Sequence, residues 1–346
     1  MSYQPALEIL RGGVVESLHH AAVAVVESNG NLIATWGSPG IKTFIRSGAK
    51  PFQVLPLLEE GGAEHFGFTR REIAIMCASH SGTDEHVKTV ASIQEKIGLS
   101  EDHLLCGTHP PIHLETADRL KKDGLEPNAN RHNCSGKHSG MLAFASLLGT
   151  PTEDYVRVGH PIQRRIVKTL SEMCGLDIDD ISIGVDGCSV PTFALPLKSA
   201  ATAFARLADP GELPDKRAEA CRTVWEAMTA YPEMVAGPGR FDTALIQAAK
   251  GVLLTKGGAE GYQGIAIAPG ARYEGSPALG VALKIADGDG GGRGRSVVAL
   301  KVLEDLEVLS AEQLRGLTEF GPRKRTNWRE IDVGELRPCF QLQQVM

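Results

Sequence analysis

The chain has 346 residues, of which 42 % are hydrophobic and 23 % charged, and its 36 Lys and Arg against 42 Asp and Glu give a formal charge of −6. This composition is typical of a globular protein of about two domains or one large one. A slightly acidic chain without a long basic run offers no electrostatic attraction to nucleic acid, so we expect no such partner. The longest apolar runs fall far short of the roughly 20 residues that cross a bilayer, which argues against a membrane protein.

The N-terminal residues and the cysteines indicate the compartment. Residues 1–10 lack a basic segment followed by an apolar core and a cleavage site, so we expect a cytoplasmic protein. Seven cysteines are an odd number, thinly spread over a long chain. This pattern argues against a disulfide framework and favours free thiols or metal ligands.

Strand patterns occur at both ends of the chain, and helix patterns lie between them. Residues 20–27 and 32–36 flank an Asn-Gly turn, which predicts a hairpin. Short β-branched runs bounded by glycine predict strands at 261–268 and 278–285, followed by a helix at 296–304. Amphipathic patterns predict helices at 49–58, 70–77, 85–97, 139–148, 162–174, 198–207, 216–229 and 243–250. Thr69 and Glu72 form a capping box before the second of these helices, and Thr83 precedes the third.

This order of elements predicts an α/β (α+β) fold. We expect one sheet assembled from both chain ends and covered by helices, with a helical region inserted between. The corresponding subdomains are about 1–45 with 250–346, which carry the sheet, and about 46–249, which is mostly helical. The alternative is two α+β domains.

One glycine-rich segment, 287–295 (DGDGGGRGR), invites a phosphate-loop interpretation because glycine amides bind anions. It lacks the GxxxxGK[ST] pattern, and Asp287 and Asp289 would repel phosphate. We therefore favour a turn that joins a strand to a helix over a site-forming loop.

A Ser-x-x-Lys spacing is the first candidate for chemistry. Ser47 and Lys50 lie three residues apart at a predicted helix start, which places them on one face. The Lys50 amine can serve as the base for the Ser47 hydroxyl if burial or a second cation lowers its pKa from about 10.4. Alone, the spacing is also common on surface helices.

Two further segments supply a second candidate serine and a second candidate lysine. Ser79 lies in the predicted tight loop Ala78-Ser79-His80-Ser81-Gly82, which could equally be a helix cap. Lys256 follows an apolar run and precedes two glycines, which let a substrate approach the backbone. A Ser-x-x-Lys, a second serine loop and a late Lys-Gly occur in this order in serine β-lactamases and related amidohydrolases. The match is partial, because Ser-Asp-Asn is missing and Lys256 precedes Gly.

Two cysteine segments form the third candidate site. Cys134 lies in NCSGKHSG and Cys188 in VDGCSVP, each beside glycine and polar residues. The two thiols could hold a soft divalent ion such as Zn²⁺, with His138 or Lys137 completing the shell. The spacing alone leaves open a pair of buried, inert cysteines or a Cys/His nucleophile.

Taken together, four segments resemble one family over nearly the whole chain. RSGAKP at 46–51, SHSGT at 79–83, NCSGKHSGM at 133–141 and GVDGCSVPTFALP at 184–196 occur in the order found in class 3, or rhizobial-type, L-asparaginases of the asparaginase II family. The resemblance implies a fold like that of serine β-lactamases and glutaminases, a homodimer, and hydrolysis of the side-chain amide of L-asparagine to L-aspartate and ammonia.

The resemblance also implies roles for individual residues. Ser47 is implied as the nucleophile with Lys50 as its base, and Ser79 and Lys256 as a second Ser–Lys pair. One zinc ion per chain is implied on Cys134, Lys137 and Cys188, with Arg46, His138 and Asp186 lining the substrate pocket. Asp186 and Arg46 suit an amino-acid amide, because a carboxylate can bind its ammonium group and a cation can bind its carboxylate group.

Two other functions stay open from the sequence. One is a glutaminase or β-lactamase-like serine amidohydrolase acting on another amide. The other is a non-catalytic protein that binds zinc or an amino acid at a degenerate site. Comparing the turnover of different amides distinguishes another amidohydrolase from an asparaginase. The absence of any turnover would indicate the non-catalytic binding protein.

Overall fold

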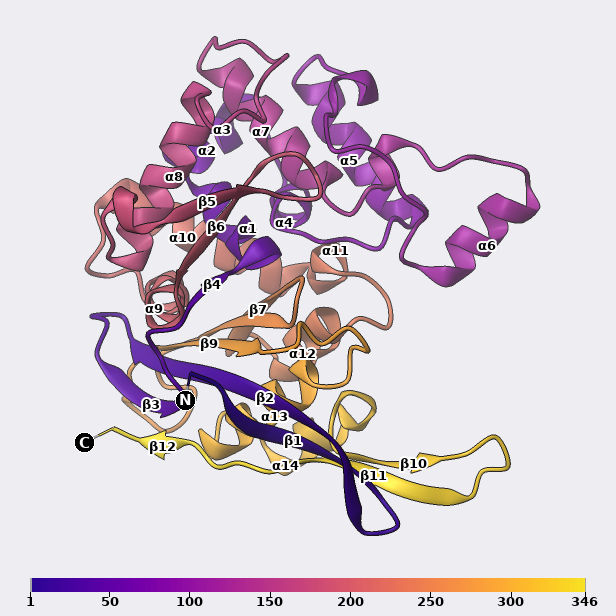
Figure 1. The fold of residues 1–346 in the computed structure, drawn as a ribbon. Coiled ribbons are helices and arrows are strands. Elements are labelled where there is room, and N and C mark those ends of the chain that lie inside the picture. Colours follow the sequence, from indigo (N-terminus) through magenta and orange to yellow (C-terminus); the bar gives the residue numbers. More distant parts are fainter. Residues whose placement is uncertain (1, 346) are drawn as a thin grey trace. The chain divides into compact units, whose positions relative to one another are not determined.

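The computed structural model describes residues 2–345, and the chain forms two compact units (Figure 1). Unit 1 comprises Met1–Ile45, Leu195–Asp209 and Ala248–Met346, and unit 2 comprises Arg46–Ala194 and Pro210–Gln247. Unit 1 contains the terminal segments, as well as the short stretch around residue 200 that the sequence analysis placed in the helical middle.

Unit 1 is built on an antiparallel sheet. Its main path runs β10-β11-β1-β2-β9-β8-β7, with β3 paired to β2 and β12 paired to β3. Because N-terminal strands lie between C-terminal ones, the sheet is formed from both chain ends, and the predicted fold class is confirmed. The strands are β1 (Gln4–Arg11), β2 (Val14–Glu27), β3 (Leu32–Trp36), β7 (Leu253–Gly258), β8 (Tyr262–Ile267), β9 (Leu279–Ile285), β10 (Arg323–Thr326), β11 (Asp332–Pro338) and β12 (Gln343–Gln344).

Local sequence explains the hairpin formed by β2 and β3. The Gly30 N–H donates to the Glu27 carbonyl at 2.9 Å, and Gly30 has a φ of 84°, which glycine adopts without a steric penalty. The predicted hairpin is present, although β2 begins at Val14, well before the predicted start. Its first residues are exposed, so they lack the apolar alternation that would reveal a strand.

Two helices cover opposite faces of this sheet. Helix α9 (Leu197–Ala208) packs on β2, β8 and β9, and α13 (Arg295–Asp305) packs on β1, β8, β9 and β11 (Figure 1). Val297 of α13 contacts Leu7 and Ile9, whose face continues through Val23 of β2. Gly280 lies on the other face, where a Cβ atom would come within 1.9 Å of the Ala201 carbonyl oxygen of α9. The absence of a side chain at this position therefore lets α9 approach the sheet.

We expect Gly280→Ala to destabilise the protein by about 3 kcal/mol or more, because the backbone of α9 would have to move to admit the methyl group. Thermal unfolding followed by circular dichroism measures this change. Gly290→Ala is the matched control, since a Cβ atom there meets nothing within 4 Å. Equal melting temperatures for the two variants would contradict the proposed close packing.

The glycine-rich segment is a turn between β9 and α13. The Asp289 carboxylate accepts the backbone N–H groups of Arg293, Gly294 and Arg295 at 2.9, 2.7 and 3.0 Å. Asp287 contacts His19 Nδ1 at 2.6 Å. Both carboxylates thus form hydrogen bonds within the chain and are not directed at a ligand, which agrees with the predicted turn.

Unit 2 is mainly helical. Its helices are α1 (Lys50–Gln53), α2 (Leu55–Glu59), α3 (Gly62–Phe66), α4 (Arg70–Met76), α5 (Asp84–Lys96), α6 (Leu114–Lys122), α7 (Ser135–Leu147), α8 (Pro161–Cys174), α10 (Asp215–Ala230), α11 (Pro232–Val235) and α12 (Phe241–Ala249), whose last residues belong to unit 1. Unit 2 also contains β5 (Ser182–Val185), most of β6 (Pro191–Pro196) and the 3₁₀ segments η1 (Arg46–Ala49), η2 (Glu101–His103), η3 (Ala129–Arg131) and η4 (Ile178–Asp180). The elements of unit 1 not given above are β4 (Lys42–Phe44), α14 (Ala311–Arg315) and η5 (Thr318–Phe320).

Two helices of unit 2 begin at the capping residues that the sequence predicted. Thr69 accepts the Glu72 N–H while the Glu72 side chain accepts the Thr69 N–H, so the predicted capping box is present at α4. Thr83 caps α5 in the same way, with His86 as its reciprocal partner. Helix α7 is buried from Ser135 to Ala145, and a Cβ atom at Gly136 would lie 2.3 Å from the Ile75 carbonyl of α4. The absence of a side chain at Gly136 therefore lets α7 pack closely on α4.

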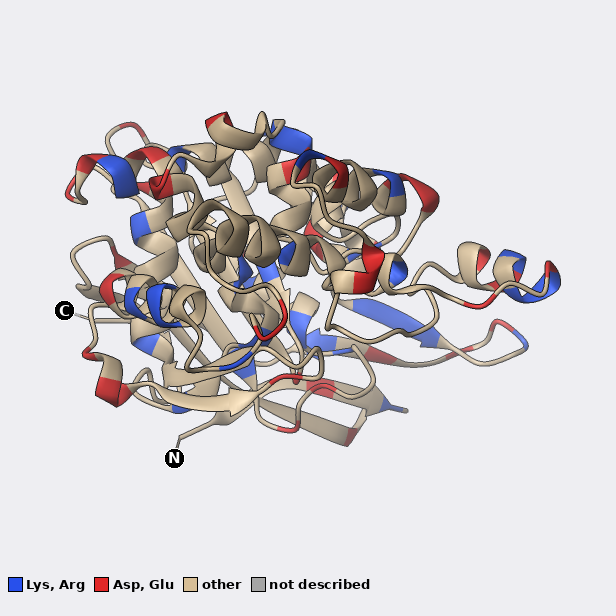
Figure 2. Ribbon diagram, turned by 90° about the horizontal axis from the view of Figure 1, so that it is seen from above, with Lys and Arg blue, Asp and Glu red and all other residues tan. Residues whose placement is uncertain are grey.

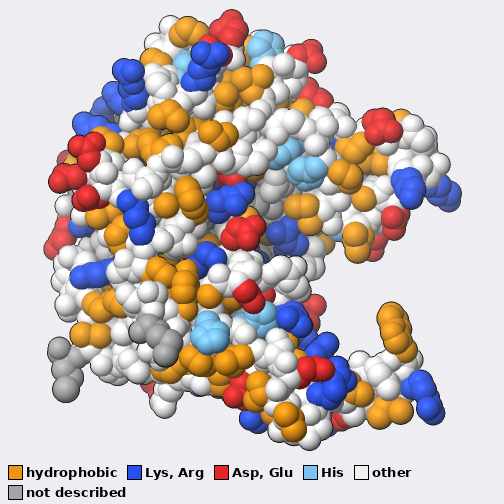
Figure 3. Space-filling model, viewed as in Figure 1, with side chains coloured by type: hydrophobic (Ala, Val, Ile, Leu, Met, Phe, Trp, Pro, Cys, Tyr) orange, Lys and Arg blue, Asp and Glu red, His pale blue; other side chains and the backbone are white. Residues whose placement is uncertain are grey.

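The surface carries charges of both signs along the helices (Figure 2). Exposed apolar side chains occur at the end of the β10–β11 hairpin, where Trp328 is fully exposed (Figure 3). No helix within residues 2–345 is long and apolar enough to span a membrane.

Candidate active site

The Lys50 side chain of unit 2 is buried, and its amine forms several hydrogen bonds. Its side chain is 1 % exposed at the start of α1, and Pro51 follows it at a position where the missing N–H costs nothing. The amine donates to Ser79 Oγ at 2.9 Å, to the Ala78 carbonyl at 2.5 Å and to the Asn133 carbonyl at 3.5 Å. Burial lowers the pKa of Lys50, which favours the neutral amine that a general base requires.

The loop that carries Ser79 is held by backbone bonds. The Ser79 N–H donates to the Val235 carbonyl at 3.0 Å, and the Ser81 hydroxyl donates to the Ala236 carbonyl at 2.7 Å. His80 is fully buried, and its Nε2 lies 2.8 Å from Ser135 Oγ. Burial lowers the pKa of His80 well below its usual value, so the ring is neutral and supports the loop by hydrogen bonding.

Ser47 lies in η1, directly before α1, and is half-buried. The preceding residue, Arg46, has a φ of 47°, a left-handed conformation that costs a non-glycine residue about 1–3 kcal/mol. The Arg46 guanidinium donates twice to Asp186 Oδ1, from Nη2 at 2.6 Å and from Nε at 2.9 Å. Residues with a strained backbone conformation cluster at functional sites, and they persist only where the surrounding contacts hold them in that conformation. The conformation of Arg46 therefore supports a functional role for this segment.

The two cysteine segments meet in unit 2. Cys134 precedes α7, Lys137 lies in its first turn, and Cys188 lies in the turn between β5 and β6. The Lys137 amine contacts Cys188 Sγ at 2.9 Å, and a hydrogen bond joins the two thiols. The Asp186 N–H donates to the Val190 carbonyl and closes this turn. All three predicted metal ligands are thus buried together.

Their mutual contacts determine their protonation. The hydrogen bond between the two sulfur atoms lowers the pKa of Cys134 and raises that of Cys188, so one thiolate is readily formed. Burial acts to lower the pKa of Lys137, but the adjacent sulfur atoms outweigh it and raise that pKa. Since an ammonium has no free lone pair, a metal ion bound to Lys137 would have to displace a proton.

The donor set fits a soft divalent ion. Two sulfur ligands and one nitrogen are the types that Zn²⁺ prefers. Within residues 2–345, no group of three or more His, Cys, Asp or Glu gathers that could hold a metal ion, so a site here depends on Lys137 as its third ligand.

His138 is oriented inward in α7. It is fully buried, and its Nδ1 lies 2.6 Å from the Tyr155 hydroxyl, which also accepts the Leu105 N–H at 2.9 Å. Nε2 of His138 is buried and has no hydrogen-bond partner among the described residues. Burial lowers the pKa of His138 well below its usual value, so the ring is neutral. Nothing in the sequence indicated Tyr155, because it lies in an irregular segment without a motif.

Lys256, the remaining predicted catalytic residue, belongs to unit 1. It lies in β7, is 1 % exposed, and donates to the Gly257 carbonyl at 2.7 Å. Ser79 belongs to unit 2, so the predicted Ser79–Lys256 pair joins residues of different units and stays a prediction. Within unit 2, the hydrogen-bond partner of Ser79 is Lys50, a pairing that sequence spacing could not indicate.

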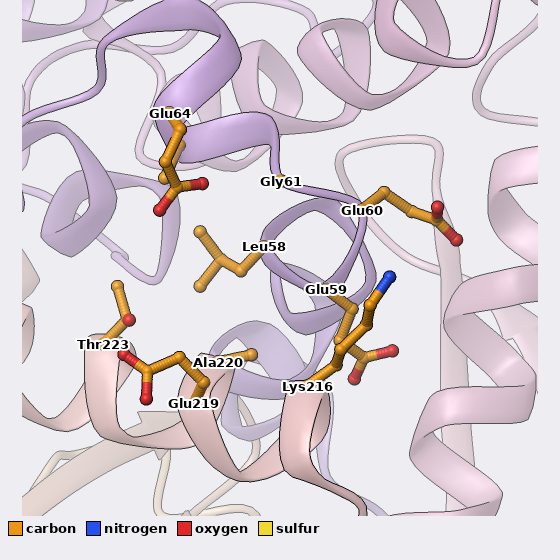
Figure 4. A pocket seen from close by; sticks show the side chains of 10 residues that line it. Leu58, Glu59, Glu60, Gly61, Glu64, Lys216, Glu219, Ala220 and Thr223 are labelled. Atoms are coloured by element: carbon orange, nitrogen blue, oxygen red, sulfur yellow. The ribbon is translucent and has the colours of Figure 1, made fainter.

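A separate pocket of about 310 Å³ lies in the same unit (Figure 4). It is lined from α2, α3 and α10, and its acidic side chains include Glu59 and Glu64. Glu59 forms an ion pair with Arg217, and Glu60 forms one with Arg165. None of the predicted site residues lines this pocket.

Comparison with known proteins identifies the family. The model of the family described as L-asparaginase II matches residues 7–338. No curated protein matches the sequence significantly. Among solved structures, the chain is similar to a probable glutaminase from Bacillus subtilis in complex with 6-diazo-5-oxo-L-norleucine, with 12 % identity, 86 % of this chain and 87 % of that chain covered, and a TM-score of 0.41.

A second Bacillus subtilis glutaminase structure, a covalent complex with 5-oxo-L-norleucine, shows 13 % identity, covers 76 % of this chain and 79 % of that chain, and gives a TM-score of 0.33. The family model covers nearly the whole chain, including every segment described above. This protein therefore belongs to the L-asparaginase II family and is an amidohydrolase.

Proposed function

We propose that the protein hydrolyses the side-chain amide of L-asparagine to L-aspartate and ammonia. The observation that carries this proposal is the buried Lys50 amine, which contacts Ser79 and lies three residues after Ser47. An amide is a poor electrophile, so its hydrolysis needs an activated hydroxyl and a proton donor for the leaving ammonia. A lysine with a lowered pKa can supply both functions, because its neutral form accepts a proton from the hydroxyl and its protonated form donates one to ammonia.

In the proposed mechanism, neutral Lys50 accepts the proton of Ser47 as Ser47 Oγ attacks the amide carbon. Two N–H bonds of the amine can remain on the Ala78 and Asn133 carbonyls, so its lone pair is directed toward a serine hydroxyl. Backbone N–H groups at the start of η1 and α1 would stabilise the oxyanion. Protonated Lys50 then gives its proton to the departing ammonia, and water hydrolyses the acyl-enzyme.

Ser79 and Lys256 have supporting roles in this proposal. Ser79 contacts Lys50 and would relay protons between the amine and the substrate. Lys256 is the proposed partner of Ser79, and a second lysine near the first would lower the pKa of either amine. The exchanged assignment, with Ser79 as the nucleophile, is tested below.

Substrate recognition follows from the charged groups near η1. Asp186 would accept the substrate ammonium, and Arg46, which pairs with Asp186, would hold that carboxylate in place. His138 would donate to a polar atom of the substrate from Nε2, the ring nitrogen that has no hydrogen-bond partner within residues 2–345.

Ammonia release from L-asparagine and L-glutamine by the purified protein tests the proposal, with a chromogenic cephalosporin as a third substrate. We expect turnover of asparagine well above the other two. A preference for glutamine or for the cephalosporin would establish the corresponding alternative, and the absence of all three activities would favour a non-catalytic binding protein.

Zinc is proposed on Cys134, Lys137 and Cys188, with one ion per chain. When bound, the ion would join the start of α7 to the β5–β6 turn and add a positive charge beside Asp186. The homodimer implied by the family resemblance is likewise a proposal.

We expect Cys188→Ala to lower the zinc content from about one ion per chain to a small fraction, because it removes one of two thiolate ligands. Elemental analysis of protein purified with added zinc measures this loss. Cys221→Ala is the matched control, since Cys221 is also fully buried but lies in α10 and is not one of the proposed ligands. Unchanged zinc content in Cys188→Ala would refute the ligand assignment.

A further inference from the structure

Tyr155 is a fully buried residue of unit 2 that the proposed mechanism does not use. We infer that Tyr155 is a positioning residue, whose hydroxyl donates a hydrogen bond to Nδ1 of His138 and so places the proton of that ring on Nε2, where it binds an oxygen atom of the substrate. The inference rests on the proposed function, because it assigns the group that prepares His138 for that substrate.

The first argument is the set of hydrogen bonds around the tyrosine hydroxyl. Within residues 2–345, Oη of Tyr155 contacts the Leu105 N–H at 2.9 Å and His138 Nδ1 at 2.6 Å. Because the N–H group can only donate, the acceptor of the hydroxyl proton is Nδ1. Burial raises the pKa of Tyr155, so the hydroxyl keeps this proton. An imidazole whose Nδ1 accepts a hydrogen bond carries its proton on Nε2.

The second argument is that both side chains are held by separate elements. His138 lies in α7, where its N–H donates to the Cys134 carbonyl at 3.0 Å. Tyr155 precedes α8, and its carbonyl accepts Nε2 of Gln163, a fully buried residue of that helix, at 2.8 Å. The two rings meet edge to face, with their centroids 5.5 Å apart and their planes at 81°. Close packing therefore keeps the hydroxyl on Nδ1 and fixes the direction of Nε2.

The third argument is that Nε2 is directed at a group outside the chain. This atom of His138 is buried and has no hydrogen-bond partner within residues 2–345. Buried polar atoms in folded proteins are paired in the large majority of cases, so we expect a bound molecule to supply the partner. A protonated Nε2 needs an acceptor, which an amino-acid amide offers in its carbonyl and carboxylate oxygens but not in its ammonium group. Tyr155 therefore determines which substrate atoms His138 can bind.

The position of the ring proton can be measured without substrate. NMR of protein containing isotope-labelled histidine distinguishes a protonated from an unprotonated ring nitrogen, and the His138 signals are assigned by their absence from His138→Gln. The wild type should show a protonated Nε2 and an unprotonated Nδ1. Tyr155→Phe keeps the ring and removes the hydroxyl, so both signals should move toward the values of mixed tautomers. A wild-type ring with its proton on Nδ1 would overturn the inference, even if Tyr155→Phe fails to fold.

Calorimetry shows whether Tyr155 acts through His138. The dissociation constant of L-asparagine is measured on Ser47→Ala, alone and combined with Tyr155→Phe, His138→Gln or both. Tyr155→Phe should weaken binding about tenfold, the effect of losing one hydrogen bond in a buried site. The amide of His138→Gln donates without a choice of tautomer, so adding Tyr155→Phe to it should change the constant by less than about twofold.

Controls separate positioning from structural damage. Tyr273→Phe removes an exposed hydroxyl of unit 1 and should change no constant. Equal losses from Tyr155→Phe with and without His138→Gln would show a purely structural role, and unchanged affinity in Tyr155→Phe would also overturn the inference. Absence of ammonia release by the wild type would instead overturn the proposed function. Since the ring proton is located without substrate, the two failures are distinguishable.

Discussion

Replacing Ser47 with alanine should abolish ammonia release from L-asparagine, with kcat lowered roughly 10⁴-fold or more, as expected when the nucleophile of a covalent mechanism is removed. Ser47 is half-buried in a short 3₁₀ segment, so the lost hydroxyl should change the free energy of unfolding by about 1 kcal/mol at most. A coupled ammonia assay measures kcat, and thermal unfolding checks that the fold is intact.

Ser79→Ala is the informative companion of this variant. If Ser79 only relays protons through Lys50, its loss should lower kcat by about 10²- to 10⁴-fold, less than the loss of Ser47. Near-normal activity in Ser47→Ala together with an inactive Ser79→Ala would show that the two serines exchange roles. Near-normal activity in both would refute Ser–Lys catalysis in this protein.

Replacing Lys50 with methionine should also have a large effect, a loss of about 10²- to 10⁴-fold in kcat, because it removes the base and its hydrogen bond to Ser79. The substitution keeps the volume of the buried side chain but leaves the Ala78 carbonyl without this donor, at a cost of about 1–3 kcal/mol in stability. Steady-state kinetics together with a melting curve separates the two effects.

Lys88→Met serves as the control, since Lys88 is an exposed lysine of α5 in the same unit. A second variant, Lys50→Ala, leaves a cavity in which a small alkylamine can replace the missing amine. Dose-dependent recovery of activity with methylamine or ethylamine would support the role of the base. Full activity in Lys50→Met would exclude it.

The local signals of the sequence were sufficient for the type and order of the longer helices other than α6 and of strands β2, β3, β8 and β9. The Asn29-Gly30 turn, the capping boxes at Thr69 and Thr83, and the apolar periodicity of the helices all depend on residues within a few positions of one another. The structure contains these elements close to their predicted bounds. The exposed strands at the chain ends were missed, because short charged segments such as Arg323–Thr326 carry no apolar alternation.

The family motifs also predicted which of the site residues lie close together. Cys134, Lys137 and Cys188 lie together, and Arg46 contacts Asp186, although the partners are separated by up to 140 positions. These contacts were expected from the resemblance to a family, since no spacing in a single sequence encodes them.

The sequence by itself determined the fold class and the class of amidohydrolase, because these follow from local patterns and from family motifs that occur in order. The roles of the individual side chains stay predictions. Only the tertiary structure decided that Lys50 contacts Ser79 and that the absence of a side chain at Gly280 lets α9 pack closely on the sheet. It also decided that the carbonyl groups of Val235 and Ala236 hold the loop that carries Ser79. Each of these depends on backbone segments brought together by packing, and the hydrogen bonds of buried carbonyl groups are satisfied only once the chain has folded.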